Sequence, residues 1–239
     1  MKQKRFKSKI GQEYNLVILT IPYFEKFQAK IGQTIKNYFK NSPLKEIKIL
    51  EIGCGPGNTT EIVLNADKRI KAVTIDNEPI MLKQAKKNLA RYLTEKRVKV
   101  IKDDALNFIS GLPDNSFTVF ASGLTIHNFN KNYREKLLQE IYRILKPKGL
   151  FINADRYAFD DQKKFQQVLN WQIRQYKKVF SNLNKPDLLK EWMAHEEDDK
   201  KPEIIMKEKV AINQMKKIGF KNIKIIFRQK IHAVLVAFK

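Results

Sequence analysis

The sequence is poor in cysteine and contains no long apolar run. Cys54 is its only cysteine, so an intrachain disulfide and a cysteine-based zinc site are both excluded, and we predict no metal site. The apolar stretch from Leu16 to Ile21 runs straight into Pro22 and is far shorter than the ~20 residues that a membrane span needs. The basic N-terminus is not followed by an apolar segment with a cleavage site. We therefore expect a cytoplasmic protein that does not enter a membrane.

Acidic residues are also scarce. The chain has 47 lysine and arginine residues against 25 aspartate and glutamate residues, which gives a net charge of +22. An excess of this size is found in proteins that bind nucleic acid. The lysines are spread along the whole chain, however, and no motif combines basic with stacking aromatic residues. We attribute the charge to compositional bias and do not expect specific nucleic-acid binding.

Apolar segments of strand length alternate with helical patterns through most of the chain. This alternation predicts an α/β fold with a parallel sheet and helices on both faces. A helix over Val210 to Ile218 should end at Gly219. The two strands after it are separated by three residues, too few for a crossover helix, so they should form an antiparallel hairpin. The predicted strands cover residues 47–52, 70–75, 98–101, 117–121, 150–153, 223–227 and 231–238.

The pattern divides the chain into four parts. Residues 1–42 form an N-terminal helical cap, and residues 43–155 form the core with its five parallel strands. Residues 156–208 break the alternation and read as a helical insertion that lies over the carboxyl edge of the sheet as a substrate lid. Residues 209–239 supply the final helix and the hairpin that completes the sheet.

Three glycines follow the first predicted strand. Gly53, Gly55 and Gly57 lie where open α/β sheets bind ligands, and glycine lets a ligand lie directly against the backbone. Their spacing differs from the dinucleotide fingerprint, whose third glycine would fall at Asn58. The lysine of a phosphate-binding loop is absent as well. The sequence therefore predicts a site for another nucleoside-containing cofactor.

Carboxylates follow the next two strands. Asp76, at the end of the second strand, can accept hydrogen bonds from both hydroxyls of a ribose. Asp76 or Asn77 could instead cap the following helix. After the third strand, the Asp104 carboxylate and a neighbouring N–H, that of Ala105, can pair with an adenine. The alternative for that segment is a solvated turn.

These segments resemble the motifs of class I S-adenosylmethionine-dependent methyltransferases. The resemblance implies a Rossmann-like, mainly parallel seven-stranded sheet, S-adenosylmethionine as cofactor, S-adenosylhomocysteine as product and a small-molecule methyl acceptor. It is carried by ILEIGCGPGNTT, VTIDNEPIML, DDALNF, SFTVFASGLTIHNF and EIYRILKPKGLFI. The cofactor-binding residues that it implies are Glu51, Gly53, Cys54, Gly55, Gly57, Asp76, Asn77, Asp104, Ala105 and Ser122.

A narrower resemblance is to carboxy-S-adenosylmethionine synthases, which act in tRNA modification. It rests on TIDNEPIML, ADRYAFDD and KKIGFKNIKIIFRQKIHAVLVAFK, and IPYFEKFQAKIG implies that Tyr23 lies near the cofactor. That family holds the extra carboxylate with an arginine of the inserted helices. The matching stretch here has Lys190 and Glu191. We therefore expect plain S-adenosylmethionine, with the synthase or another tRNA-modification enzyme as the alternative.

Methyl transfer needs a general base only when the acceptor must lose a proton. His127, after the fourth strand, is the candidate, and a packed histidine is the alternative. A third possibility for the whole chain is a regulatory subunit that binds the cofactor without catalysis. The candidates for the acceptor pocket are Arg156, Tyr157, Trp192 and His195, each of which could also be ordinary packing.

Overall fold

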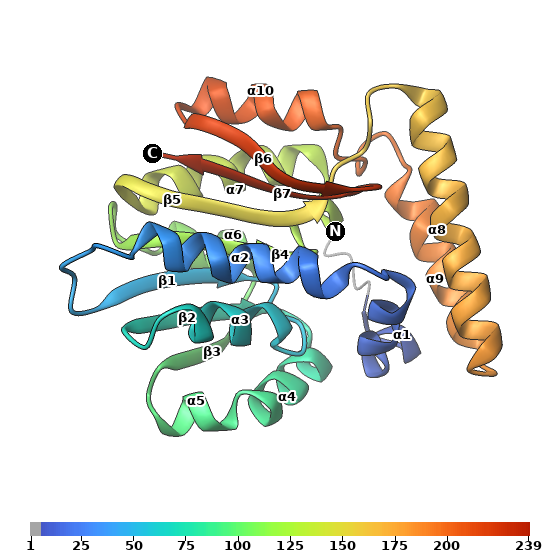
Figure 1. Cartoon of the computed structure of the whole chain (residues 1–239), viewed down its shortest axis with the longest axis horizontal. Helices are drawn as coiled ribbons and strands as arrows, with labels where there is room; N and C mark the ends of the chain where they lie inside the picture. The colour runs from blue at the N-terminus through green and yellow to red at the C-terminus, as the bar shows by residue number, and fades with distance from the viewer. Residues whose placement is uncertain (1–5) are drawn as a thin grey trace.

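The computed structural model describes residues 6–239 and contains one seven-stranded sheet (Figure 1). The strand order is β3-β2-β1-β4-β5-β7-β6. Neighbouring strands from β3 to β5 are parallel, whereas β7 is antiparallel to both β5 and β6. The predicted Rossmann-like fold with a C-terminal hairpin is therefore confirmed. The strands are β1 Ile47–Ile52, β2 Ile70–Asp76, β3 Val98–Lys102, β4 Phe117–Gly123, β5 Leu145–Arg156, β6 Lys221–Gln229 and β7 His232–Phe238.

Helices cover both faces of the sheet, and for this reason its central strands are apolar along most of their length. One buried apolar cluster lies under α2, α3, α4 and α5, and a second lies under α6, α7 and α10. The first four helices are α2 Phe24–Tyr38, α3 Asn58–Ala66, α4 Pro79–Asn88 and α5 Ala90–Thr94. The other three are α6 Ala105–Ser110, α7 Lys131–Ile144 and α10 Glu208–Ile218.

Four further helices lie across the edge at which the parallel strands end (Figure 1). They are α1 Lys9–Gln12, the 3-10 helix η1 Tyr14–Thr20, α8 Gln162–Asn182 and α9 Pro186–Asp199. We call these four elements together the cover. They share a buried cluster of Ile10, Val17, Tyr176, Phe180, Leu188 and Trp192. The N-terminal elements α1 and η1 thus pack with the helices of the insertion.

The fifth strand is longer than the predicted 150–153 and includes Lys146-Pro147-Lys148-Gly149. Helix α7 ends at Ile144, and β5 begins at Leu145, so these four residues lie inside a strand. They form a bulge, because Phe117 of β4 pairs with Leu145 whereas Val119 pairs with Leu150. Lys148 adopts a φ of 64°, and its N–H donates to Lys239 O at 3.0 Å. The end of the chain therefore stabilises a segment whose composition is typical of a turn.

Within residues 6–239, no helix combines the length and the apolar character that crossing a bilayer requires.

Candidate active site

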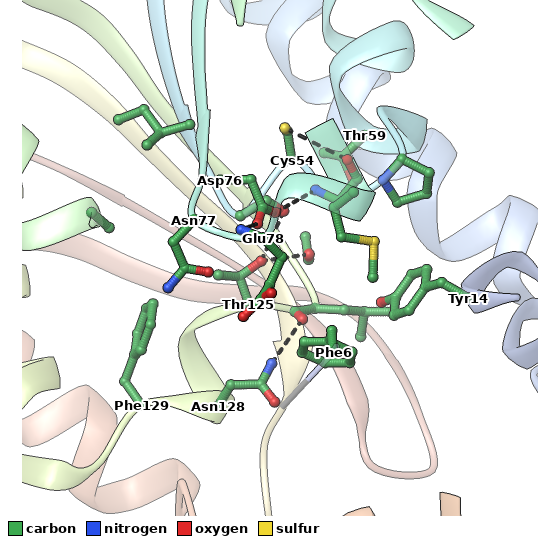
Figure 2. A pocket seen from close by; sticks show the side chains of 18 of the residues that line it. Phe6, Tyr14, Cys54, Thr59, Asp76, Asn77, Glu78, Thr125, Asn128 and Phe129 are labelled. Atoms are coloured by element: carbon green, nitrogen blue, oxygen red, sulfur yellow. Dashed lines mark hydrogen bonds between the residues drawn. The ribbon is translucent and has the colours of Figure 1, made fainter. Parts of the chain in front are cut away.

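A cavity of about 350 Å³ opens at the carboxyl ends of β1, β2 and β4 (Figure 2). We call it the donor cavity. The glycine loop and the ends of β2 and β3 form one side, and the loop after β4 forms another. Figure 2 shows Asn77 and Phe129 on one side of the space and Tyr14 on the other. The cavity thus lies where the glycine motif places the ligand of an open α/β sheet.

The first two glycines of the loop serve different purposes. Gly53 has a φ of +62°, and a Cβ there would lie 2.2 Å from the side chain of Thr125. Gly55 has a φ of +52°, and a Cβ there would meet no atom within 4 Å. Gly53 therefore permits the loop after β4 to approach, whereas the backbone at Gly55 is left bare beside the cavity. This is the cradle that a cofactor lying against the backbone requires.

Asp76 fixes this loop. Its carboxylate accepts a hydrogen bond from Gly55 N at 2.8 Å and another from Glu78 N at 2.9 Å. Burial raises the pKa of Asp76, and the two backbone N–H groups oppose that rise. Each carboxylate oxygen can accept more than one hydrogen bond, so Asp76 can hold the loop and still accept from a ligand hydroxyl.

Asp104 is the N-cap of α6 rather than part of a solvated turn. Its side chain accepts hydrogen bonds from Leu106 N and Asn107 N, both at 3.1 Å, and from Tyr133 OH at 2.8 Å. Helix α6 was not predicted, because it has only six residues and follows the motif directly. Asp104 and Ala105 both line the donor cavity.

Most of the predicted cofactor-binding residues meet in this cavity. Those that line it are Gly53, Cys54, Gly55, Asp76, Asn77, Asp104 and Ala105. Burial raises the pKa of the Cys54 thiol, which fits a small packed residue better than a nucleophile.

Four of the predicted residues are not among the described residues that line the cavity, namely Tyr23, Glu51, Gly57 and Ser122. Tyr23 OH is 2.9 Å from His232 Nδ1. Gly57 precedes α3, and a Cβ there would lie 3.1 Å from the side chain of Leu89. Ser122 is completely buried in β4.

Glu51 lies beneath the loop. Its Oε2 accepts from Thr60 Oγ1 at 2.6 Å and from Thr74 Oγ1 at 2.9 Å, and burial raises its pKa to about 7.

Sequence reasoning missed several lining residues. Phe6 and Tyr14 come from the N-terminal segment, and no periodic pattern placed them at the cofactor edge. The others are Phe24, Gln28, Pro56, Asn58, Thr59, Ile75, Glu78, Met81, Asp103, Gly123, Leu124, Thr125, Asn128, Phe129, Asn130 and Tyr133.

The donor cavity is acidic although the chain is strongly basic. Its described lining includes four carboxylates and neither lysine nor arginine. Lysine and arginine make up 47 of the 239 residues, so their absence from the 25 described lining residues is notable. The four acids are Asp76, Glu78, Asp103 and Asp104. A cationic ligand fits such a lining better than one with additional negative charge.

A second, much smaller cavity of about 30 Å³ adjoins the first. We call it the inner cavity. It shares Phe6, Tyr14, Leu124 and Asn128 with the donor cavity. It is also lined by the predicted catalytic and acceptor residues His127, Arg156, Trp192 and His195.

Tyr157 does not line the inner cavity. It lines a separate cavity of about 690 Å³, where its hydroxyl accepts from Asn153 Nδ2 at 2.8 Å.

His127 is held by Asp155, which is completely buried. Its Nδ1 donates to Asp155 Oδ1 at 2.5 Å, and its backbone N–H donates to Oδ2 at 3.1 Å. The second ring nitrogen, Nε2, is 3.7 Å from Asp199 Oδ2 on α9.

Arg156 is engaged by carboxylates of the insertion. It pairs with Glu196, and its Nη1 is 3.2 Å from Asp199 Oδ2. Burial alone would lower the pKa of Arg156, but the carboxylates of Glu196 and Asp199 hold it well above its usual range. An acceptor could use this guanidinium only by sharing it with two carboxylates that are already in place.

Comparison with known proteins agrees with this geometry. Residues 49–149 match the family described as a methyltransferase domain. This segment of the chain is therefore similar to methyltransferase domains. The matched segment runs from β1 into β5 and includes the glycine loop, Asp76 and Asp104. The predictions of an S-adenosylmethionine-dependent methyltransferase and of its cofactor are confirmed at this level.

Named proteins are similar to this chain over most of its length. A carboxy-S-adenosyl-L-methionine synthase from Shewanella piezotolerans is 24% identical over 98% of this chain and 92% of its own length. A putative S-adenosylmethionine-dependent methyltransferase from Methanococcus maripaludis has a TM-score of 0.62 at 18% identity, covering 100% of this chain and 96% of that one. The CurJ carbon methyltransferase has a TM-score of 0.63 at 15% identity. The match covers 88% of this chain and 53% of that protein.

Proposed function

We propose that the enzyme transfers the methyl group of S-adenosylmethionine to a small acceptor that binds at the inner cavity. The observation that carries this proposal is the acidic lining of the donor cavity, with four carboxylates and no lysine or arginine among its described residues. S-adenosylmethionine carries a sulfonium and an ammonium group against one carboxylate, so its net charge is positive.

The residues of the donor cavity fit the parts of this cofactor. Asp104 and Ala105 line the cavity and would pair with the adenine, and Asp76 would accept hydrogen bonds from the ribose. The bare backbone at Gly55 leaves room for the methionine portion. When bound, the cofactor supplies a methyl carbon already activated by the sulfonium. The protein then has to align the acceptor with that carbon and exclude water.

The cover supplies the acceptor side and excludes water. Tyr14 of η1 lines both cavities, as does Phe6, which precedes α1, whereas Trp192 and His195 of α9 line only the inner one. A volume of about 30 Å³ holds little more than a water molecule. An acceptor therefore has to be small, and α8 and α9 have to move as a lid when it enters.

The carboxylated cofactor is the second candidate, and the similarity to a carboxy-S-adenosyl-L-methionine synthase over nearly the whole chain favours it. Its additional carboxylate would need a cation within reach, or burial of that charge would cost several kcal/mol. The Glu191 carboxylate accepts hydrogen bonds from Ser8 Oγ and Ile10 N, and Lys190 is exposed. Neither side chain lines the inner cavity. Arg156 is the cation at the inner cavity within residues 6–239, and it is already paired.

Mass spectrometry of the ligand that co-purifies with the protein tests the proposal. We expect S-adenosylmethionine or S-adenosylhomocysteine, with the amount strongly reduced in Asp76→Asn and unchanged in the exposed control Asp114→Asn. A ligand heavier than S-adenosylmethionine by one carboxylate would establish the second candidate. A nicotinamide cofactor, or equal loading of both variants, would refute the donor site.

A further inference from the structure

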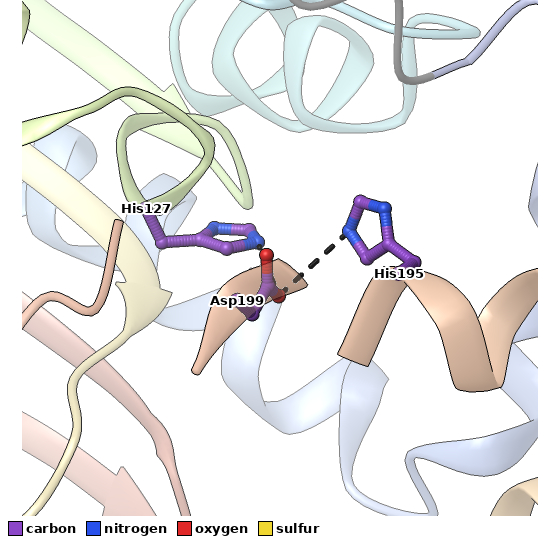
Figure 3. A group of neighbouring side chains, drawn as sticks. All are labelled: His127, His195 and Asp199. Carbon is purple, nitrogen blue, oxygen red and sulfur yellow. Dashed lines mark ion pairs between the residues drawn. The ribbon is translucent and has the colours of Figure 1, made fainter. Parts of the chain in front are cut away.

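We propose that His127, His195 and Asp199 form a binding site for one divalent transition-metal ion beside the donor cavity. The three side chains come from η2 Ile126–Asn128 and from α9, and all are buried. Figure 3 shows both imidazole rings directed toward the Asp199 carboxylate. The possible ligand atoms of the three residues lie within 4.8 Å of one another. Two histidines and one carboxylate are a frequent ligand set for zinc and for non-haem iron.

The distances fit a shared ion better than direct hydrogen bonds. His127 Nε2 and His195 Nε2 are each 3.7 Å from Asp199 Oδ2. Hydrogen bonds between nitrogen and oxygen are about 2.7–3.2 Å long, so both separations are too large. Ligand bonds of about 2.1 Å in a tetrahedral site place neighbouring ligand atoms roughly 3.4 Å apart. A bound ion would therefore require the two histidine–aspartate separations to shorten by roughly 0.3 Å, and no pair of ligand atoms to approach by more than roughly 1.4 Å.

Asp155 prepares His127 for this role. Because Nδ1 is hydrogen-bonded to Asp155 Oδ1, Nε2 is the ring nitrogen left to bind a metal ion. Asp155 is itself oriented by the backbone N–H groups of His127 and Arg156, at 3.1 and 2.8 Å. A metal-ligating histidine that is oriented by a carboxylate in this manner is a common arrangement. Coordination would occupy the Nε2 lone pair, so this role replaces that of His127 as a free base.

The charge around the site also favours a cation. Asp155, Glu196 and Asp199 are buried carboxylates, and two arginines lie among them. These are Arg156, which pairs with Glu196 and Asp199, and Arg134, which donates to the carbonyls of Ile204 and Ile205. Among residues 6–239, three buried carboxylates thus surround the two histidines, and a divalent ion bound between the histidines would interact favourably with these carboxylates.

The position of the site suggests what it does. His127 and His195 line the inner cavity, which adjoins the donor cavity. If the proposed methyl transfer is correct, the ion would coordinate a hydroxyl or carboxylate oxygen of the acceptor and lower the pKa of a bound hydroxyl. This role rests on the proposed function, whereas binding of the ion does not.

Metal binding is measured directly on the full chain. The protein is stripped with a chelator, its fold is checked by circular dichroism, and it is dialysed against Zn²⁺ or Co²⁺ before the bound metal is quantified. We expect one ion per chain, and an intense visible absorption of the Co²⁺ form that indicates low coordination with nitrogen ligands. Asp199→Asn and His195→Gln should weaken binding at least ~100-fold, and Asp155→Asn about 10–100-fold, the range for outer ligands.

The matched control is Asp198→Asn. This residue precedes Asp199 on α9, but it pairs with Lys201 at 2.5 Å on the surface, so its substitution should leave metal binding unchanged. Less than one ion per folded wild-type chain overturns the assignment, as does an equal loss in Asp198→Asn and Asp199→Asn. Calorimetry with S-adenosylmethionine on the metal-free protein tests the proposed function separately, since failure of either measurement leaves the other intact.

Discussion

The buried Glu51 should make the stability of this protein depend on pH in an unusual direction. Glu51 is completely buried, and its Oε1 has no hydrogen-bond partner among the described residues. Burial raises its pKa from 4.5 to about 7, although the hydroxyls of Thr60 and Thr74 favour the charged form. The folded state therefore holds this proton over a pH range in which the unfolded chain has released it.

The sign and the size follow from proton linkage. Between pH 4.5 and about 7 the folded state binds more protons than the unfolded state, so the free energy of unfolding falls as pH rises. The contribution of protonated Glu51 is fully present below pH 4.5 and is lost as pH rises through about 7. A difference between 4.5 and about 7, at about 1.36 kcal/mol per pH unit, corresponds to ~3 kcal/mol.

Urea unfolding of wild type and Glu51→Gln at several pH values measures this effect. Glutamine cannot ionise, so the free energy of unfolding of the variant minus that of wild type should increase by ~3 kcal/mol from pH 4.5 to pH 8. A constant offset from the amide group does not alter this slope. The exposed Glu61→Gln on α3 is the control and should show no such slope. A pH-independent difference for Glu51→Gln would refute the reasoning.

Three further predictions concern the donor cavity and the surface. Asp76→Ala should weaken S-adenosylmethionine binding by roughly 1–3 kcal/mol in calorimetry, since a charged hydrogen-bond acceptor is lost, and unchanged affinity would contradict its role. Cys54 lines the donor cavity, and burial raises its thiol pKa, so alkylation should be slow and slower still with S-adenosylmethionine bound. Equal alkylation rates with and without S-adenosylmethionine would show that the cofactor does not bind beside Cys54. Binding of tRNA should be indifferent to sequence and fall steeply with salt, and tight, selective binding at physiological salt would overturn the assignment of the charge to composition.

The parts of the fold and site that depend on local sequence were predictable. Strand β1 has the predicted bounds Ile47–Ile52, because strands buried on both faces appear as short apolar runs. Gly219 ends α10 with a φ of 115°, as a glycine stop signal requires. The glycine loop, Asp76 and Asp104 could be placed together because the carboxyl ends of parallel strands meet at one edge.

What depends on packing between distant segments was not predictable. The bulge that contains Pro147 requires pairing with Lys239, and the sequence of the bulge alone indicates a turn. His195 and Asp199 reach His127 only because α9 lies across the sheet edge, and no spacing along the chain predicts that approach. The same is true of Arg156, whose partner Glu196 is forty residues away.

The cover joins two segments that are far apart in the chain, and this affects how quickly bound cofactor can leave. Phe6 and Tyr14 lie against the donor cavity, and the segment that carries them is tied to α9 by Glu191, which accepts from Ile10 N at 2.9 Å, and by the exposed pair of Lys9 and Asp187. Release of the product would require the segment that carries Phe6 and Tyr14 to separate from α9. Because salt screens exposed ion pairs, the residence time of the product, and with it the rate of turnover, should depend on ionic strength.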